Sequence, residues 1–413
     1  MKRILLILTL ALVALAGCKK EPAPEPIAGK VSQIKLVGMP TEFTVGRSFT
    51  ISAVITPDDA TDKSVTFSSS NPEVATVEYI ESEYNYSLAL LKAVGPGKAT
   101  ITATANDGSG VKAEAEVTVI LKKTTFASPA NCYIVTNAGE YIFKTLKGNS
   151  SESVGSVASA EVLWETFGTH KAPEVGDLVK DVSYNNGEIT FKATDRKGNA
   201  VIAAKDAAGN ILWSWHIWLT DQPVEKVYPS TATMMDRNLG AISASSGNVG
   251  TIGLKYQWGR KDPFLGAASH NFNVEAKSTI AWPPSEESSA TTGTILYATE
   301  HPTTFIDRSA EHTNEDWYYT GNKSTDNTRW TTSDKAKSIY DPCPAGWRVP
   351  DDYKDVLNAD LNETLALYPL GDYWTASPDP DSYNAIYVEV SSHSVSTYSQ
   401  SRYMGLKVRC IKE

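Results

Sequence analysis

The stretch DPCPAGWRVPDDYKDVL, residues 341–357, holds Cys343, one of only four cysteines among 413 residues. Such a cysteine can be a nucleophile, a metal ligand or half of a disulfide. A zinc site needs about four ligands at regular spacing, and neither Cys nor His occurs within ten residues of Cys343. A catalytic thiol needs a base beside it. The role of Cys343 therefore depends on the compartment and on the fold around it.

The composition is that of a multidomain globular protein. A chain of 413 residues is too long for one ordinary core, so two to four domains are expected. Hydrophobic residues make up 41% and charged residues 21%, which excludes a disordered chain. The net charge of −10 and the lack of a basic stripe argue against nucleic acid as a partner.

The N-terminus predicts secretion. A basic start precedes an apolar run from Ile4 to Ala16, which is shorter than the roughly 20 residues of a membrane-spanning helix. This order, with small residues at the end, describes a secretory signal. The sequence LAGC, residues 15–18, resembles the lipobox of bacterial lipoproteins. The resemblance implies that residues 1–17 are removed and that Cys18 becomes the diacylated first residue. An ordinary signal peptide is the alternative.

Residues 18–29 predict a tether. Proline occupies every second position from Pro22 to Pro26, and this composition favours an extended, stiff segment. Two acyl chains make membrane anchoring effectively stable. Lysine after Cys18 implies, through the lipoprotein resemblance, sorting to the outer membrane. We expect the folded part to face the cell exterior.

Residues 30–121 predict a small antiparallel sandwich. From Val111 to Val119, apolar residues alternate with charged or hydroxyl residues, which is the period of a half-buried strand. The segments SSSNPEVATVE (68–78) and LKAVGPGKATITATA (91–105) resemble the bacterial immunoglobulin-like group 2 domain. Such domains commonly serve as spacers in surface proteins and adhesins, so the resemblance transfers no catalytic residue.

Residues 123–223 predict a second β-rich domain. In ILWSWHIWLTD, residues 211–221, aromatic side chains fall on both faces of a strand. This pattern indicates a strand covered on both sides, with an aromatic ligand platform as the alternative. His216 has no second ligand at metal spacing, so we interpret it as a structural histidine. ANCYIV (130–135) and the segments GNAVIAAKD and ILWSWHIW are similar to a module of Bacteroidetes surface lipoproteins and fimbria-related proteins.

Residues 228–413 carry a series of ordered motifs. They are MMDRNLGA (234–241), GLKYQWGRKDPF (253–264), YDPCPAGWRVP (340–350), YWTAS (373–377) and GLKVRCIKE (405–413). Their order resembles the Fibrobacter succinogenes major paralogous domain. The resemblance implies a C-type lectin-like α+β fold with a large insert between Leu265 and Ser338. One helix is predicted at 351–368, where an apolar stripe follows Pro350 and two acidic residues.

This resemblance and the local sequence also imply roles for the cysteines after Cys18. Cys343 and Cys410 both fall in motifs of the resembled domain, and disulfides persist outside the reducing cytosol. The resemblance therefore implies a Cys343–Cys410 disulfide, with an unpaired or a reactive thiol as alternatives. Cys132 lies in the apolar strand-like ANCYIV, where we expect a buried, inert thiol. Pairing with another chain is its alternative.

The sequence carries no catalytic signature, so we expect no enzyme. His-Glu-x-x-His, Gly-x-Ser-x-Gly and a phosphate loop are all absent. Asp379-Pro-Asp381 lacks the Gly and the distal Glu of a calcium loop. We predict neither a metal site nor a cofactor.

Aromatic residues in the insert are the candidate ligand site. Sugar recognition uses flat apolar faces for the ring, and carboxylates and amides for the hydroxyls. The alternative is that these aromatics fill a loop-rich core. The candidate residues are Trp282, Asp316, Trp317, Tyr318 and Trp330.

Together these features predict a multidomain, mainly β protein. Its parts are an Ig-like β-sandwich, a second sandwich-like domain and a C-terminal C-type lectin-like α+β domain. The predicted function is a lipid-anchored surface protein for binding or adhesion, which recognises glycan or a host or partner protein through its C-terminal domain. A fimbria-associated form would have pilus subunits as partners. The alternative is an enzyme or a polysaccharide-degradation accessory protein on a lectin-like fold.

Overall fold

The computed structural model describes residues 29–81, 87–227, 232–245, 249–265, 276–281, 285–309, 315–319, 326–351, 371–391 and 393–413. The predicted signal, Cys18, most of the tether, Trp282 and the helix predicted at 351–368, except its first residue, lie outside the described residues. The chain divides into two compact units. The first ends at Val119, and the second consists of residues 44–46 and 120–413. Within the described ranges, no helix has the length and hydrophobicity that crossing a membrane requires.

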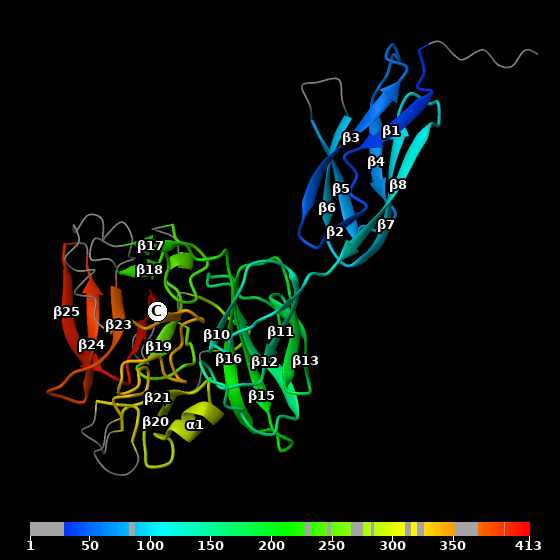
Figure 1. Cartoon of the computed structure of the whole chain (residues 1–413). Coiled ribbons are helices and arrows are strands. Elements are labelled where there is room, and N and C mark those ends of the chain that lie inside the picture. The colour runs from blue at the N-terminus through cyan, green and yellow to red at the C-terminus, as the bar shows by residue number, and fades with distance from the viewer. Residues whose placement is uncertain are drawn as a thin grey trace, which may run out of the picture. The chain divides into compact units, whose positions relative to one another are not determined.

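The first unit is a sandwich of two four-stranded sheets (Figure 1). Alternation along β3 and β6 turns Ile51, Ala53 and Leu91 inward, where each is almost fully buried. The predicted alternation from Val111 to Val119 is present in β8, although Ala113 and Ala115 are only half buried. One sheet has the order β1 (Gln33–Val37), β3 (Ser48–Thr56), β6 (Ser87–Ala93), β5 (Ala75–Ile80), and the other β2 (Glu42–Thr44), β8 (Lys112–Ile120), β7 (Gly97–Ala105), β4 (Val65–Ser69).

The second unit begins with two more four-stranded sheets, which share one aromatic core. Phe143 and Phe191 come from one sheet, and Ile202 and Trp215 from the other. One sheet has the order β10 (Cys132–Val135), β16 (Ile211–Leu219), β15 (Gly198–Lys205), β12 (Ser159–Thr166). The other has the order β13 (Val179–Asn185), β14 (Glu188–Ala193), β11 (Gly139–Lys144), β9 (Lys123–Thr125).

The remaining elements of the second unit are short strands around long loops. Most of the strands belong to two sheets, and β19 and β25 are the outer strands of the larger sheet. The smaller sheet has the order β17 (Glu225–Val227), β18 (Thr233–Met235), β27 (Ile411–Lys412), β22 (Trp347–Arg348). The larger has the order β19 (Lys255–Gln257), β26 (Gly405–Lys407), β23 (Gly371–Pro378), β24 (Asn384–Val390), β25 (Val395–Ser401). Between Leu265 and Ser338 lie β20 (Ser285–Glu287), α1 (Ile295–Glu300) and β21 (Phe305–Asp307), while η1 covers Val249–Thr251.

Strand β16 is covered on both faces, as its aromatic pattern predicts. Trp213 and Trp215 pack into the core of the two sheets just described, whereas Trp218 packs against residues from the motif-bearing third block. Trp164 and Val201 also belong to this other cluster. The blocks 123–223 and 228–413, which the sequence predicts as separate domains, therefore share a hydrophobic core within one compact unit.

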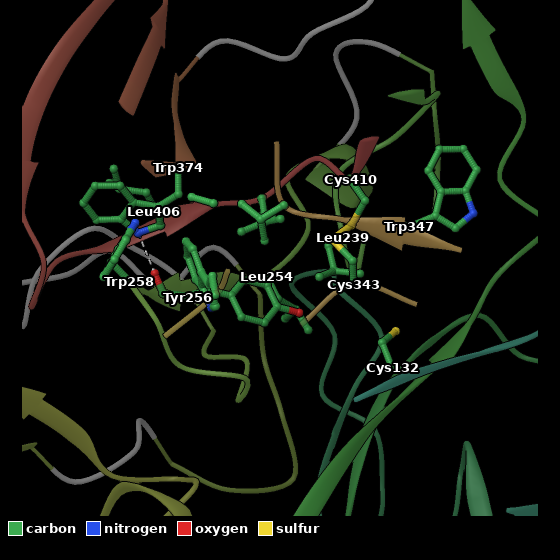
Figure 2. Close-up of a cluster of buried hydrophobic side chains, with 14 of the residues drawn as sticks. Cys132, Leu239, Leu254, Tyr256, Trp258, Cys343, Trp347, Trp374, Leu406 and Cys410 are labelled. Carbon is green, nitrogen blue, oxygen red and sulfur yellow. Dashed lines mark hydrogen bonds between the residues drawn. A yellow bond between two sulfur atoms is a disulfide. The ribbon is translucent and has the colours of Figure 1, made fainter. Parts of the chain in front are cut away.

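The ordered motifs of residues 228–413 converge on that shared core (Figure 2). Buried tryptophans need a partner for the indole N–H. Here Trp258 donates to the carbonyl of Thr375 at 2.9 Å, and Trp374 donates to that of Tyr256 at 2.8 Å. The motif residues in the cluster are Met235, Leu239, Leu254, Tyr256, Trp258, Cys343, Trp347, Val349, Trp374, Ala376, Leu406, Val408 and Cys410. The motifs therefore build the interior of this unit.

The mainly β, multidomain prediction is confirmed. Among the described residues, regular helix is limited to the six residues of α1 and the single turn of η1. A lectin-like α+β assignment for residues 228–413 needs more helix than these ranges contain, so it stays a prediction.

Candidate functional site

The predicted disulfide is confirmed. Cys343 and Cys410 are bonded, with Cα atoms 6.0 Å apart, and both are fully buried. The bond connects the loop before β22 to the residue before β27, and β22 pairs with β27 through Arg348 and Ile411. Neither sulfur is available as a nucleophile or as a metal ligand.

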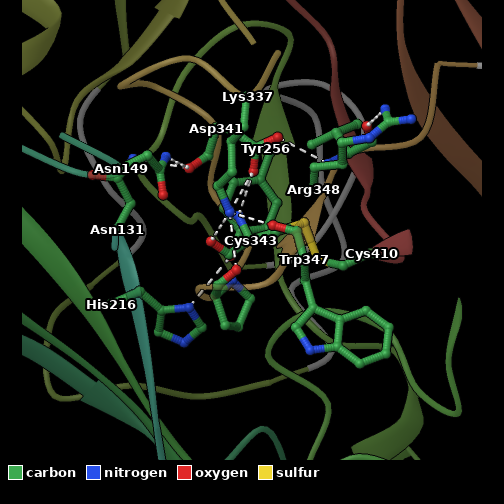
Figure 3. Close-up of a disulfide and its surroundings, with 12 residues drawn as sticks. Asn131, Asn149, His216, Tyr256, Lys337, Asp341, Cys343, Trp347, Arg348 and Cys410 are labelled. Carbon is green, nitrogen blue, oxygen red and sulfur yellow. Dashed lines mark hydrogen bonds and ion pairs between the residues drawn. A yellow bond between two sulfur atoms is a disulfide. The ribbon is translucent and has the colours of Figure 1, made fainter. Parts of the chain in front are cut away.

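A buried ion pair holds the loop that carries Cys343 (Figure 3). The Asp341 carboxylate accepts hydrogen bonds from the backbone N–H groups of Cys343 and Val349, each at 2.8 Å. The Lys337 ammonium donates to the carbonyls of Cys343, Pro344 and Trp347, and lies 3.5 Å from Asp341. Burial raises the pKa of Asp341, and Lys337 opposes that rise. These bonds fix the loop and serve no visible catalytic purpose.

The structure corrects most of the predicted ligand site. Trp317, Trp330 and Asp316 are buried, so none of them can offer a face or a carboxylate to an external sugar. Trp317 donates its indole N–H to the carbonyl of Trp258 at 2.8 Å, and Trp330 donates to that of Arg260 at 3.0 Å. For these residues the alternative of a loop-rich core is the observed one. Tyr318 is half buried, and Trp282 lies outside the described residues.

Arginines stack on two of the buried aromatics, Trp317 and Trp258. The Arg329 guanidinium lies 4.8 Å from the ring centre of Trp317 and 4.9 Å from that of Trp258, and Arg402 lies 4.4 Å from the latter. Asp316 forms ion pairs with both arginines. Burial lowers the pKa of Arg402 to about 10, which leaves it charged at neutral pH. The insert thus contributes a buried cation–π cluster.

His216 and Cys132 have the structural roles predicted for them. The His216 Nε2 lies 2.8 Å from the Asn199 Oδ1, and burial lowers the pKa of this imidazole to about 3. Cys132 is a buried free cysteine, and burial raises the pKa of its thiol well above the ordinary value. Since the thiolate is the reactive form, Cys132 is inert in the folded unit.

One buried cluster has the residue types of a serine–lysine catalytic pair. The Lys261 Nζ lies 2.5 Å from the Ser214 Oγ and 2.6 Å from the Asp262 Oδ1. All three side chains are almost fully buried, so a substrate cannot reach them. In the part of the chain that the structure describes, no three His, Cys, Asp or Glu side chains gather as a metal site.

Among the residues that the structure describes, an open cleft of about 640 Å³ is a candidate for ligand binding. This volume falls within the usual range for small-ligand sites, about 300–1,000 Å³. Its lining combines two aromatic rings, several hydroxyl groups, one side-chain amide and two oppositely charged exposed side chains. The lining residues are Phe126, Ala127, Ser128, Pro129, Tyr133, Lys144, Leu146, Asn149, Ser150, Ser151, Lys337, Ala345, Gly346 and Glu413.

The aromatic side of the cleft is backed by the core. Phe126 is half buried, and its ring centre lies 4.6 Å from that of Tyr133 and 5.6 Å from that of Tyr141. Tyr133 in turn packs on Phe143, with ring centres 4.7 Å apart. Because these rings rest on a packed sheet core, they form a rigid surface that costs little entropy to present to a ligand.

The disulfide loop also lines the cleft, through Ala345 and Gly346. Two asparagines attach this loop to the two sheets formed by residues 123–219. The Asn131 Nδ2 donates to the carbonyls of Ile339 and Asp341, at 2.7 and 2.8 Å. The Asn149 Nδ2 donates to the carbonyl of Ser338 at 2.7 Å, and Figure 3 shows the Asn149 side chain beside Asp341 of the same loop. Gly148 makes room for the Asn131 side chain, since a Cβ at position 148 would lie 2.1 Å from the Asn131 Oδ1. The cleft therefore has two fixed sides.

Sequence reasoning missed this cleft because its residues are ordinary loop residues. Ser, Pro and Asn in segments 126–129 and 149–151 give a turn signal only. The one usable signal was Asn131 beside Cys132, a polar residue in an apolar strand. The fold alone brings these segments to Ala345 and Gly346, roughly two hundred positions along the chain.

The comparisons with known proteins identify one part of the chain. Residues 30–117 match the model of the bacterial Ig-like domain (group 2), which confirms the resemblance for the first unit. A search of the curated proteins finds no match.

Solved structures give distant alignments. The Escherichia coli adhesin FdeC is 14% identical over 47% of this chain and 66% of its own, with a TM-score of 0.21. The Yersinia pseudotuberculosis adhesin InvE is 10% identical over 94% of this chain and 100% of its own, with a TM-score of 0.20. SGBP-B of a Bacteroides ovatus mixed-linkage glucan utilization locus, solved with a heptasaccharide, is 15% identical over 49% and 48%, with a TM-score of 0.14. Likeness at this level supports no statement about function.

Proposed function

We propose that the chain is a cell-surface binding protein that holds a glycan in the cleft between Phe126 and the disulfide loop. The observation that carries the proposal is the composition of this cleft. A half-buried ring can stack on a sugar face, and the hydroxyls of Ser128 and Ser150 and the Oδ1 of Asn149 can bind its hydroxyls. A segment of a surface protein is the competing ligand.

The proposal includes an outer-membrane lipid anchor at Cys18. It is supported by the lipobox-like sequence and by the disulfide, a bond that is typical of oxidising compartments. The Ig-like unit would then act as a spacer between the anchor and the binding unit. The finer assignment of residues 228–413 to the Fibrobacter succinogenes major paralogous, C-type lectin-like group rests on its ordered motifs. A fimbria-associated protein that contacts pilus subunits is one form of this proposal.

Binding without catalysis is also proposed. An acid–base mechanism needs titratable groups that face a substrate. In the cleft, Lys337 is occupied by three carbonyls, while Lys144 and Glu413 are exposed at the rim. The alternative, an enzyme or a polysaccharide-degradation accessory protein, would have to use one of these two exposed lining residues on a bound sugar.

The test is a glycan array with the soluble chain from Lys19 to Glu413, followed by calorimetry on each hit. The key variant is Ala345→Trp, which adds bulk at an exposed position in the cleft. We expect it to abolish binding without loss of stability. Ala207→Trp is the matched control, because Ala207 is equally exposed in the 206–210 turn and does not line the cleft.

Binding that survives Ala345→Trp would place the ligand outside the cleft. If the chain binds no polysaccharide or mucin on the array, the sugar proposal is contradicted. Each retained glycan is also incubated with the chain and analysed by mass spectrometry. Shortened products would favour the enzyme alternative.

A further inference from the structure

Strand β25 is an outer strand whose middle residues, Thr397 to Ser399, are exposed, whereas its last residue, Ser401, is buried and bonded to Glu315. It pairs with β24 from Val395 opposite Val390 to Ser401 opposite Asn384. In the part of the chain that the structure describes, no strand pairs with its other edge, which faces away from the sheet in Figure 1. Alternate residues of such an edge present N–H and C=O groups that a further strand can bind.

This edge lacks the features that usually prevent strand pairing. Proteins protect outer strands with charged residues, proline or bulges. The sequence of β25, VSTYSQS, has neither charge nor proline, and its pairing with β24 shows no register shift. By contrast, β13 carries Lys180 and Asp181 together with a bulge, and β1 carries Lys35. Strand β4 is also uncharged, but it is shorter and lies beside β5.

An aromatic column leads from the core to this edge. Trp374 is fully buried and meets Tyr387 edge-on, with ring centres 6.4 Å apart. Tyr387 lies opposite Tyr398, with ring centres 5.9 Å apart, and Tyr398 is 50% exposed. Directly opposed aromatic residues stabilise neighbouring strands. The exposed end of the column therefore offers a ring to a partner strand.

We propose that two copies of this chain associate through β25, which pairs antiparallel with itself about Tyr398. A two-fold axis through Tyr398 centres the pairing on the exposed residues Thr397 to Ser399 and keeps each side chain on its own face. It places Tyr398 opposite Tyr398 of the second copy, Ser396 opposite Gln400, and Thr397 opposite Ser399. No charge opposes another in this register, and the two five-stranded sheets become one continuous sheet.

Cysteine scanning tests the register. Opposed residues in antiparallel strands have Cα atoms about 4.5–5.5 Å apart, which suits a disulfide. In the soluble chain from Lys19 to Glu413, Tyr398→Cys should give a covalent dimer under mild oxidation. Ser396→Cys alone should not, whereas Ser396→Cys combined with Gln400→Cys should. Equal cross-linking of the Ser396→Cys variant would overturn this register.

Charge placement tests the association itself. We expect a concentration-dependent dimer of the parent chain in analytical ultracentrifugation, and loss of that dimer in Thr397→Lys. Ser183→Lys adds the same charge to the already protected edge of β13 and should dimerise like the parent. Circular dichroism checks that both variants fold. A parent chain that stays monomeric up to its solubility limit, or a Thr397→Lys variant that still dimerises, would refute the proposal.

Discussion

At the residue scale, several buried polar side chains of the second unit form hydrogen bonds with other protein groups instead of with water. His216 illustrates this, since its Nε2 meets Asn199 and its ring lies beside Trp218, with ring centres 6.4 Å apart. A buried imidazole without a carboxylate partner is held neutral. The cost of charging it therefore appears in the stability of the whole unit.

The pH dependence of stability should expose this cost. The pKa of His216 falls from 6.5 to about 3 on folding. Between these values the unfolded chain binds more protons than the folded chain, so stability is lost as the pH falls from 6.5 towards 3. Its contribution to the free energy of unfolding changes by at most about 1.4 kcal/mol per pH unit. We expect His216→Gln, compared with the parent by urea unfolding from pH 7 to 4, to flatten this fall.

The control for this measurement is His170→Gln, at an exposed loop position. It should leave the profile of the parent unchanged. Asp341 and Glu165 act in the opposite direction, because burial raises the pKa of each carboxyl. The difference between variant and parent isolates the histidine, and identical slopes in the two would show that His216 charges freely in the folded state.

At the element scale, the disulfide and the pairing of β22 with β27 close a long loop. The two cysteines are separated by 67 positions. A crosslink of this length removes conformational freedom from the unfolded chain and stabilises the unit by about 4 kcal/mol in the loop-entropy model. The bonds of Lys337 and Asp341 then hold the same loop from within.

Removal of the disulfide should therefore weaken the second unit selectively. We expect the double variant Cys343→Ser and Cys410→Ser to lose about 4 kcal/mol of unfolding free energy, less any strain in the native bond. All ten tryptophans lie after residue 120, so their fluorescence reports on this unit alone. The Ig-like unit, followed by hydrogen exchange, is an internal control. An unchanged fluorescence transition would mean that the loop is held by its polar bonds instead.

The sequence predicted those elements whose pattern is local. The alternation in β8, the two covered faces of β16 and the bonded cysteines were all readable from residue types and motif order. The insert aromatics were misassigned because composition does not distinguish an exposed Trp317 from a buried one that lies against the Arg329 guanidinium. The cleft could not be foreseen, since it depends on contacts between Asn131 and residues more than two hundred positions away.

At the scale of the whole molecule, the proposed lipid anchor determines where the two units act. A mature chain with two or more acyl chains on Cys18 stays on the membrane, whereas an ordinary signal peptide would release it. The lipobox resemblance and the proline-rich spacing after it motivate the anchor.

Localisation of Cys18→Ser tests this. We expect the parent to label with radioactive palmitate and to fractionate with the outer membrane. The variant should lose the label and appear in the soluble fraction or as an unprocessed precursor. Surface protease treatment of intact cells should degrade the parent if it faces outward. A parent that carries no lipid label would contradict the anchor, and resistance to protease would contradict only the orientation.

The place of Cys410 and β27 in the sequence also constrains how the second unit comes together. Residues 132–330 supply only part of the shared core, and β18 and β22 gain their common neighbour, β27, only when residues 411–412 have been synthesised. Until then, Trp218 and Trp164 lack much of their packing. For the exported form proposed above, we expect the second unit to complete its folding only after translocation, when Cys343 and Cys410 meet in the oxidising compartment that bonds them.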